Sequence, residues 1–235
     1  MVRKLAYSVS EREHWISAGG SLLGILAVAW VSHIWLGAHG AIFVASSMGS
    51  AAVLLFAAPH GAMSQPWPLF GGNLVSALVG VSCARWLGNE PMLAASLAVS
   101  LSIAAMYSLR CLHPPGGATA LYAVLGGETV HTLGYEYVFS PVLLNVVALF
   151  AVAVAFNYPF AWRRYPQSWV RRPHSAAKTA EDSMIPHSNL VYALSQLDTF
   201  VDVSEEDLQR IYALALAGAP SAKPAVSIEP VSART

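Results

Sequence analysis

Charged residues are scarce in this sequence. Asp, Glu, Lys and Arg make up 11% of its 235 residues, against about 25% in a typical soluble protein. Hydrophobic residues reach 55%, and the mean hydropathy is +0.51. This composition excludes a soluble globular domain for residues 14–162 and predicts that this part of the chain lies in a lipid bilayer.

Acidic residues are especially rare in the apolar part of the chain. Between residues 16 and 162 they are limited to Glu90, Glu128 and Glu136, each in an expected loop. Cation sites and proton pumps generally place Asp or Glu inside the helix bundle, whereas hydroxyls, histidines and amides can hold an anion. The sequence therefore disfavours cation transport and favours an anion or a neutral solute.

Several other signals are also missing. The 13 basic and 13 acidic residues cancel, which leaves no positive surplus to bind nucleic acid. Cys83 and Cys111 form no CxxC or Cys/His pattern and read as packing residues. The 8 histidines form no HxH or HExxH motif, and no nucleophile and base stand at a catalytic spacing. We expect no metal, no cofactor and no enzyme activity.

Long apolar runs are abundant. Five of them approach the roughly 20 residues that a membrane-spanning helix needs, namely Ile16–Leu36, Gly40–Ala58, Leu69–Leu87, Met92–Leu109 and Phe139–Trp162. The first is as long as a full span, so it reads as a retained helix rather than a cleaved signal. A further run, Pro115–Leu125, would form only about 17 Å of helix, against a hydrocarbon core of about 30 Å.

These runs predict an all-α polytopic membrane bundle of about six transmembrane segments, one of them short or broken, plus a small cytoplasmic helical tail. Basic residues cluster before the first run and after the last one, which predicts that both termini lie on the cytoplasmic side of a bacterial-type inner membrane. These basic residues are Arg3, Lys4, Arg12, Arg163, Arg164, Arg171, Arg172 and Lys178. An even number of crossings follows, with four as the alternative to six.

The expected organisation has four parts. Residues 1–13 form a cytoplasmic segment, and residues 14–172 form the membrane domain. Residues 173–217 form a cytoplasmic tail with helices at Asn189–Leu197 and Glu205–Ala217, and residues 218–235 are a disordered end rich in Pro, Ala and Ser. So small a bundle is expected to form a homo-oligomer, and the Gly20 and Gly24 pair can join helices within or between subunits.

The segment Cys111-Leu-His-Pro-Pro-Gly-Gly-Ala-Thr-Ala-Leu121 breaks the apolar pattern. Its prolines end one helix and can begin the next, and its glycines let a ligand approach the backbone. The first amides of a helix have no internal partners and lie at the positive end of the helix dipole. The segment is therefore a candidate anion cradle, as expected of broken helices in transporters.

A weaker version of the pattern occurs earlier, in Ala57-Ala-Pro-His-Gly-Ala-Met-Ser-Gln-Pro-Trp-Pro68. Each pattern is followed by a proline, an asparagine and an apolar helix: Pro68 precedes Asn73, and Pro141 precedes Asn145. We interpret this as a weak internal repeat whose second copy carries an insertion around residues 126–137. Paired interrupted segments predict a substrate site where the two halves meet.

At His113-Pro114-Pro115 the chain resembles the HPP family of integral membrane proteins, named for that tripeptide. The resemblance covers about residues 14–172 and extends to Gly49-Ser-Ala-Ala-Val-Leu-Leu-Phe56, Ala58-Pro-His60, Ser64-Gln-Pro66, Gly71-Gly72 and Arg163-Arg-Tyr-Pro-Gln-Ser-Trp169. One departure is Asn73, where the family often has His. Some relatives carry nucleotide-sensing CBS modules after the membrane domain; this sequence ends before such a module, and we expect no nucleotide regulation in cis.

The resemblance implies a membrane transporter, because members of the family are linked to nitrite movement in chloroplasts and cyanobacteria. We therefore expect a transporter or channel for a small, nitrite-like inorganic anion. The alternative is a membrane interaction or sensory protein, in which the HPP turn is structural and the tail binds a partner.

The expected substrate site combines both interrupted segments with the two asparagines. Its residues are Pro59, His60, Gly61, Ser64, Gln65, Asn73, His113, Pro114, Pro115, Gly116, Gly117, Ala118, Thr119 and Asn145. Gly116, Gly117, Ala118 and Thr119 would present amides. His113 would donate to the anion near neutral pH, or, in a plainer interpretation, cap the preceding helix.

Overall fold

The computed structural model describes residues 11–169 together with Leu208 and Tyr212, and the side chains of these residues except 35–46. Within them, every element is helical and no strand occurs, so the all-α prediction is confirmed. The predicted tail helices and disordered end lie outside the described residues, apart from Leu208 and Tyr212.

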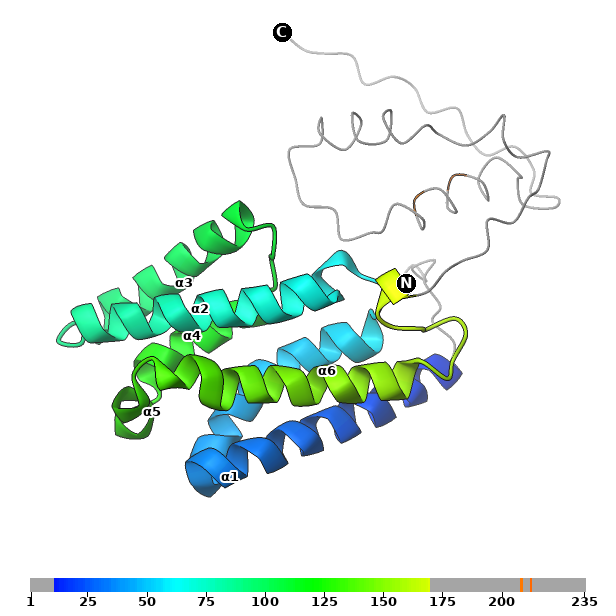
Figure 1. The fold of residues 1–235 in the computed structure, drawn as a ribbon, viewed down its shortest axis with the longest axis horizontal. Coiled ribbons are helices and arrows are strands. Elements are labelled where there is room, and N and C mark those ends of the chain that lie inside the picture. Colours follow the sequence, from blue (N-terminus) through cyan, green and yellow to red (C-terminus); the bar gives the residue numbers. More distant parts are fainter. Residues whose placement is uncertain (1–10, 170–207, 209–211, 213–235) are drawn as a thin grey trace, which may run out of the picture. The chain divides into compact units, whose positions relative to one another are not determined.

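Helix α1 (Glu11–Ala57) folds back on itself. A straight helix of 47 residues would be about 70 Å long. However, a Cβ placed on Gly20 would lie 2.4 Å from the Phe56 ring, so the two ends of α1 lie side by side. Figure 1 shows the second leg returning along the first. The two legs correspond to the runs predicted at Ile16–Leu36 and Gly40–Ala58. Gly20 and Gly24 contact Phe56 within the chain.

Prolines begin the next three helices of the bundle, where a missing N–H costs nothing. A short 3₁₀ turn, η1 (Ala62–Ser64), leads into α2 (Pro66–Trp86), and α3 (Pro91–Ser108) runs back beside it. The indole nitrogen of Trp67 donates to the Leu109 carbonyl at 3.1 Å, which ties the start of α2 to the end of α3. Helix α4 (Pro115–Leu125) has the bounds that the sequence predicts.

The segment that follows α4 contains more helix than the sequence predicts. Residues read as an outer loop hold a short helix, α5 (Glu128–Leu133), before the π-helical η2 (Val138–Leu143) and α6 (Leu144–Asn157). Ser140, at φ −134° and ψ 107°, interrupts the helical backbone just before Pro141. The 3₁₀ turn η3 (Gln167–Trp169) closes the described bundle.

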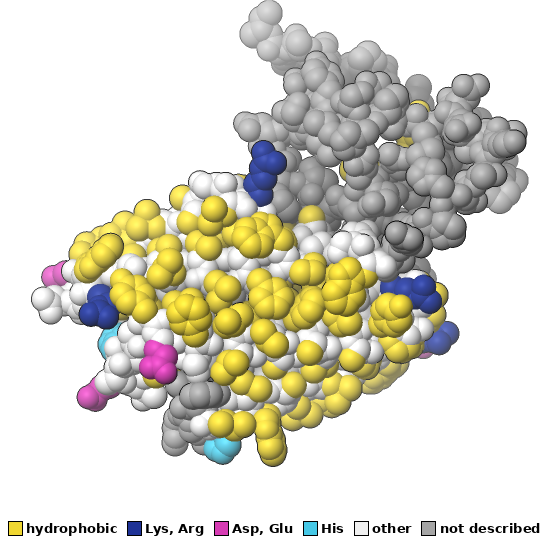
Figure 2. Space-filling model, viewed as in Figure 1, with side chains coloured by type: hydrophobic (Ala, Val, Ile, Leu, Met, Phe, Trp, Pro, Cys, Tyr) yellow, Lys and Arg dark blue, Asp and Glu magenta, His cyan; other side chains and the backbone are white. Residues whose placement is uncertain are grey.

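Four segments of the described chain are long and apolar enough to cross a membrane: Glu11–Ile34, Pro66–Trp86, Pro91–Ser108 and Val138–Asn157. Ser47–Ala57 and α4 are shorter apolar helices. Six full crossings therefore stay a prediction. Figure 2 shows apolar side chains along the length of the helices, with charged groups towards their ends. Such an exposed apolar surface suits contact with lipid.

A buried arginine joins three parts of the bundle at one end. Arg163, which is 1% exposed, pairs with Glu13 and donates to the Phe56 carbonyl. Its Nε also donates to the Asn157 Oδ1 at 3.1 Å. The start of α1, the end of α1 and the end of α6 are thus held together by one guanidinium, which can make several fixed hydrogen bonds at once.

Candidate functional site

Small residues bring α2 and α4 into close contact. Gly72, Ser76 and Gly80 stand one turn apart on α2 and face α4. A Cβ on Gly116 would lie 2.7 Å from the Gly72 carbonyl oxygen and 2.7 Å from the Ser76 Oγ. Likewise, a Cβ on Gly80 would lie 2.6 Å from the Ala120 carbonyl oxygen. Small side chains allow two backbones to approach this closely in a membrane protein.

His113 is fully buried in the segment that connects α3 to α4. Its Nδ1 lies 2.9 Å from the Met63 carbonyl oxygen, and its Nε2 has no hydrogen-bond partner. Because a carbonyl only accepts, Nδ1 carries a proton. Nε2 is then an open acceptor in the neutral ring or an open donor in the cation. Gly72 makes room for the ring, since a Cβ there would lie 2.5 Å from the His113 Cβ.

Two predicted site residues, Asn73 and Thr119, form a buried hydrogen-bonded pair. The Thr119 hydroxyl donates to the Asn73 Oδ1 at 2.8 Å, and the Asn73 Nδ2 donates to the Leu69 carbonyl at 2.8 Å. Tyr137, also buried, donates to the Thr119 carbonyl at 3.3 Å. Since Asn73 follows Gly72 in α2, this pair and His113 lie around the same stretch of the α2–α4 contact.

The amides expected to cradle an anion at the start of α4 are partly occupied. The Gly116 N–H donates to the His113 carbonyl at 2.9 Å, and the Gly117 N–H donates to the Pro114 carbonyl at 3.0 Å. The expectation that these two amides are free is therefore wrong, because the turn before the helix satisfies them. Pro115 is buried, whereas Pro114 and Ala118 are exposed. Gly117 has only Val99 near its Cβ position, at 3.9 Å.

The earlier interrupted segment forms an internally bonded turn between α1 and α2. Ser64 donates to the Ala58 carbonyl at 2.7 Å, and Gln65 donates to the carbonyls of Pro59 and Gly61, each at 3.1 Å. Its contact with the HPP segment is the Met63 carbonyl on His113. His60 is partly buried beside this turn. The Ser64 and Gln65 side chains therefore stabilise the turn whose Met63 carbonyl contacts His113.

Asn145 belongs to another contact of the bundle. Its Nδ2 donates to the Ser32 hydroxyl of α1 at 2.7 Å, and its Oδ1 is buried without a hydrogen-bond partner. Asn73 and Asn145 are both fully buried on apolar helices. They bond to different helices, however: Asn73 contacts α4, whereas Asn145 contacts α1.

Sequence reasoning missed two buried residues of structural importance, Tyr137 and Tyr165. The Tyr165 hydroxyl donates to the Ser64 carbonyl at 2.8 Å, and burial raises the pKa of this phenol, which keeps it a neutral donor. Tyrosines near span ends usually read as interfacial anchors, and the sequence carries no signal that separates a buried one. No metal-binding group of His, Cys, Asp or Glu occurs among the described residues.

Residues 6–166 match the transmembrane region of the HPP family. Two Dictyostelium discoideum proteins, named only as transmembrane proteins, are similar. One is 36% identical over 159 residues, covering 66% of this chain and 50% of the relative. The other is 35% identical over 153 residues, covering 63% and 53%.

The chain thus spans about half the length of the curated relatives it matches. No solved structure matches it. The His113-Pro114-Pro115 tripeptide lies inside the matched region. The chain therefore belongs to the HPP family, in its transmembrane region.

Proposed function

We propose that this chain is a transporter or channel for a small inorganic anion, with nitrite as the leading candidate, rather than an enzyme. The single observation that carries the proposal is the His113 Nε2, a buried polar atom without a partner at the helix break. Such groups are rare in proteins, because leaving one unpaired costs about 1–3 kcal/mol. When an anion and a proton bind together, the ring becomes the cation, and its Nε2–H can donate to the anion and recover that cost.

The buried polar groups around His113 agree with an anion more than with a cation. The buried polar side chains in the described residues are hydroxyls, amides, one histidine and one arginine, with no carboxylate among them. A dehydrated cation would find no countercharge there, whereas the Nε2–H of a protonated His113 can donate to an anion. We place the substrate beside His113, Asn73 and Thr119, and assign the Gly116 and Gly117 amides to the turn itself.

The basic residues at the Arg163 end support an orientation with both termini in the cytoplasm. Arg12 lies 5.0 Å from the Trp162 ring centroid, and Arg164 follows directly after the buried Arg163. Positive residues favour the cytoplasmic side of a membrane. We therefore propose that this end faces the cytoplasm, in a plasma membrane of the bacterial type, and that the protein acts as a homo-oligomer.

The test is anion flux into vesicles that contain the purified full chain, with nitrite, nitrate, chloride and potassium compared. We expect nitrite uptake well above that of protein-free vesicles, and no potassium uptake. The informative variant is His113→Asn, because the Asn amide nitrogen occupies the place of Nδ1 and keeps the Met63 contact, whereas nothing replaces Nε2. This variant should fold normally and lose most of the flux. Absence of flux for every anion in the unchanged protein would overturn the proposal.

A second candidate function is a membrane interaction protein in which the HPP turn is structural. The internal hydrogen bonds of Ser64, Gln65, Gly116 and Gly117 favour it, because they show side chains and amides used to shape the turn. This second function predicts that His113→Asn leaves the anion flux of the unchanged protein as it was, and that the tail binds a specific protein. The vesicle assay separates the two functions.

A further inference from the structure

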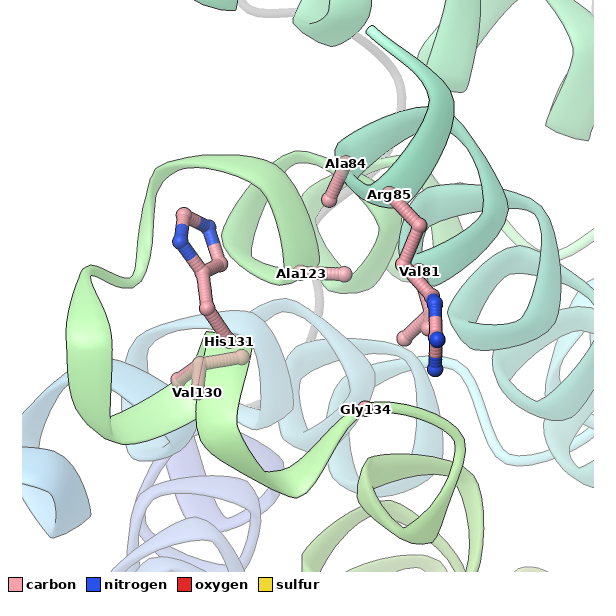
Figure 3. Close-up of a pocket in the computed structure, with 7 residues that line it drawn as sticks. All are labelled: Val81, Ala84, Arg85, Ala123, Val130, His131 and Gly134. Atoms are coloured by element: carbon pink, nitrogen blue, oxygen red, sulfur yellow. The ribbon is translucent and has the colours of Figure 1, made fainter. Parts of the chain in front are cut away.

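A second feature that can bind an anion lies at the other end of α2. A cavity of about 170 Å³ lies between α2, α4 and α5, lined by Val81, Ala84, Arg85, Ala123, Val130, His131 and Gly134. In Figure 3 the alanine and valine side chains form its walls, and the Arg85 guanidinium extends along one side towards Gly134. Of the lining residues, only Arg85 carries a permanent charge, and the His131 Nε2 lies 2.8 Å from the Val124 carbonyl oxygen.

The Arg85 side chain is held in place without a carboxylate. Its guanidinium lies over the Tyr135 ring, 5.4 Å from the centroid, and the Tyr135 hydroxyl lies 3.2 Å from the Ser82 Oγ on the preceding turn of α2. Gly134 has a φ of +52°, and a Cβ there would lie 3.3 Å from the Arg85 Nη1. A glycine turn and an aromatic face therefore position the guanidinium beside the cavity.

Arg85 is exposed, so a ligand can reach its guanidinium. Among residues 11–169, Arg163 and Glu13 form the only ion pair, so Arg85 has no acidic partner there. The acidic residues on this side, Glu90, Glu128 and Glu136, are exposed and do not form an ion pair with it. A guanidinium presents five N–H donors in a planar fork, which suits a planar oxyanion with two oxygens.

The cavity also lies in line with the site around His113. Arg85 follows Asn73 by 12 residues on α2, which is about 18 Å of helix. On the facing helix, Ala123 stands one turn beyond Thr119. The cavity and the Asn73–Thr119 pair therefore occupy successive levels of the same two-helix contact. The cavity has room for a triatomic anion together with water.

We propose that this cavity is an anion-capture vestibule, in which Arg85 binds a small inorganic oxyanion before it reaches the buried site. The inference rests on the proposed anion transport and assigns a first binding step to it. A fixed positive charge in a recess raises the local anion concentration and the rate of entry, and this effect weakens as salt rises. Arg85 is a capture residue here, and His113 serves the inner site.

The first test compares nitrite flux in Arg85→Gln, Arg85→Lys and Arg164→Gln. Arg164 is a matched control, because its guanidinium also lies over a tyrosine, 5.6 Å from the Tyr158 ring centroid, but at the other end of the bundle. We expect Arg85→Gln to raise the half-saturating nitrite concentration several-fold with little change in maximal flux. Lysine should restore part of the effect, and Arg164→Gln should match the unchanged protein. An unchanged half-saturation in Arg85→Gln would overturn the vestibule but leave transport standing.

The second test needs no transport. Ala84, which lines the cavity, is changed to cysteine in a chain that carries Cys83→Ala and Cys111→Ala, and the new thiol is treated with anionic and cationic thiosulfonate reagents of equal size. We expect the anionic reagent to react faster, and the ratio of the two rates to fall several-fold when Arg85→Gln is added. Nitrite should slow the reaction only when Arg85 is present.

The two assays separate the two proposals. A rate ratio that is the same with and without Arg85 overturns the vestibule, whatever the flux assay gives. A ratio that depends on Arg85, together with slowing by nitrite and no flux in the unchanged protein, would keep the anion site and overturn the proposed transport.

Discussion

The two ends of the α2–α4 contact differ in packing and in how their polar groups are paired. Near Gly72 the helices approach so closely that a Cβ on Gly116 would meet backbone, and the polar groups are bonded within the chain except for the His113 Nε2. Near Arg85 a cavity lies between α2, α4 and α5, and the arginine has no carboxylate partner in the described chain. One helix pair thus offers both a buried contact that can select a ligand and an open charge that can attract it.

The largest expected effect tests what holds the tightly packed end together. Arg163→Gln removes the buried guanidinium, so the Phe56 carbonyl loses this donor and the Glu13 carboxylate loses this cation. Breaking a buried ion pair from one side costs about 3–5 kcal/mol. We expect a correspondingly large loss of stability in detergent, measured by thermal or denaturant unfolding. Arg164→Gln, at the exposed neighbour, should change stability little; equal losses in the two variants would contradict the role of Arg163.

Gly116→Ala should come next. Its new Cβ would lie 2.7 Å from the Gly72 carbonyl oxygen, and backbone atoms cannot move aside as a side chain can. Overpacking of this kind costs about 1–3 kcal/mol, and we expect the upper part of that range.

The control for this change is the next residue. In Gly117→Ala the new Cβ has only Val99 within reach, at 3.9 Å, and alanine favours a helix over glycine by about 1 kcal/mol. The same unfolding measurement should find Gly117→Ala neutral or slightly stabilising. If both variants unfold alike, then α2 and α4 are not as close as described.

Gly134→Ala sharpens the comparison at the open end. The backbone there has a φ of +52° and the Cβ would press on the Arg85 guanidinium, so we expect a loss of about 2 kcal/mol together with a displaced arginine. Gly127, at φ +74° with nothing near its Cβ, provides the control with backbone strain alone. Both variants should lose stability, but only Gly134→Ala should alter the reagent selectivity at an Ala84→Cys site. Equal selectivity in both would contradict the positioning of Arg85.

Thr119→Val should give the smallest effect. It keeps the shape of the side chain but removes the hydroxyl that donates to Asn73, and an unpaired buried oxygen costs about 1–3 kcal/mol. We expect about 1–2 kcal/mol here, because the Asn73 Oδ1 loses its donor while the Asn73 Nδ2 keeps its bond to the Leu69 carbonyl. In Thr119→Ser the hydroxyl remains, so the Asn73 contact should survive; a larger loss for serine than for valine would show that the methyl group matters more. Unfolding in detergent measures both.

Much of the architecture could be predicted from the apolar runs. Helices α2, α3 and α4 lie within a few residues of their predicted bounds, because prolines at 66, 91 and 115 begin them and each run needs intrahelical hydrogen bonds in lipid. Helix α5 was missed, since its six residues are too few for periodicity to indicate a helix. The buried tyrosines were missed because hydropathy does not distinguish a core tyrosine from an interfacial one.

The candidate site was predicted in part. Asn73, His113 and Thr119 come together as their motifs suggest, whereas Ser64 and Gln65 bond to their own turn and Asn145 bonds to Ser32. The Gly116 and Gly117 amides were expected to be free, but they donate to the His113 and Pro114 carbonyls of the turn that begins α4.

The sequence by itself determined that this chain is a helical membrane protein with a break at His113-Pro114-Pro115, because hydropathy and proline act locally. Only the tertiary structure decided which polar atoms are left unpaired. Whether the His113 Nε2 and the Arg85 guanidinium find partners depends on residues such as Met63 and Gly134, which lie about 50 residues away along the chain but adjacent in space.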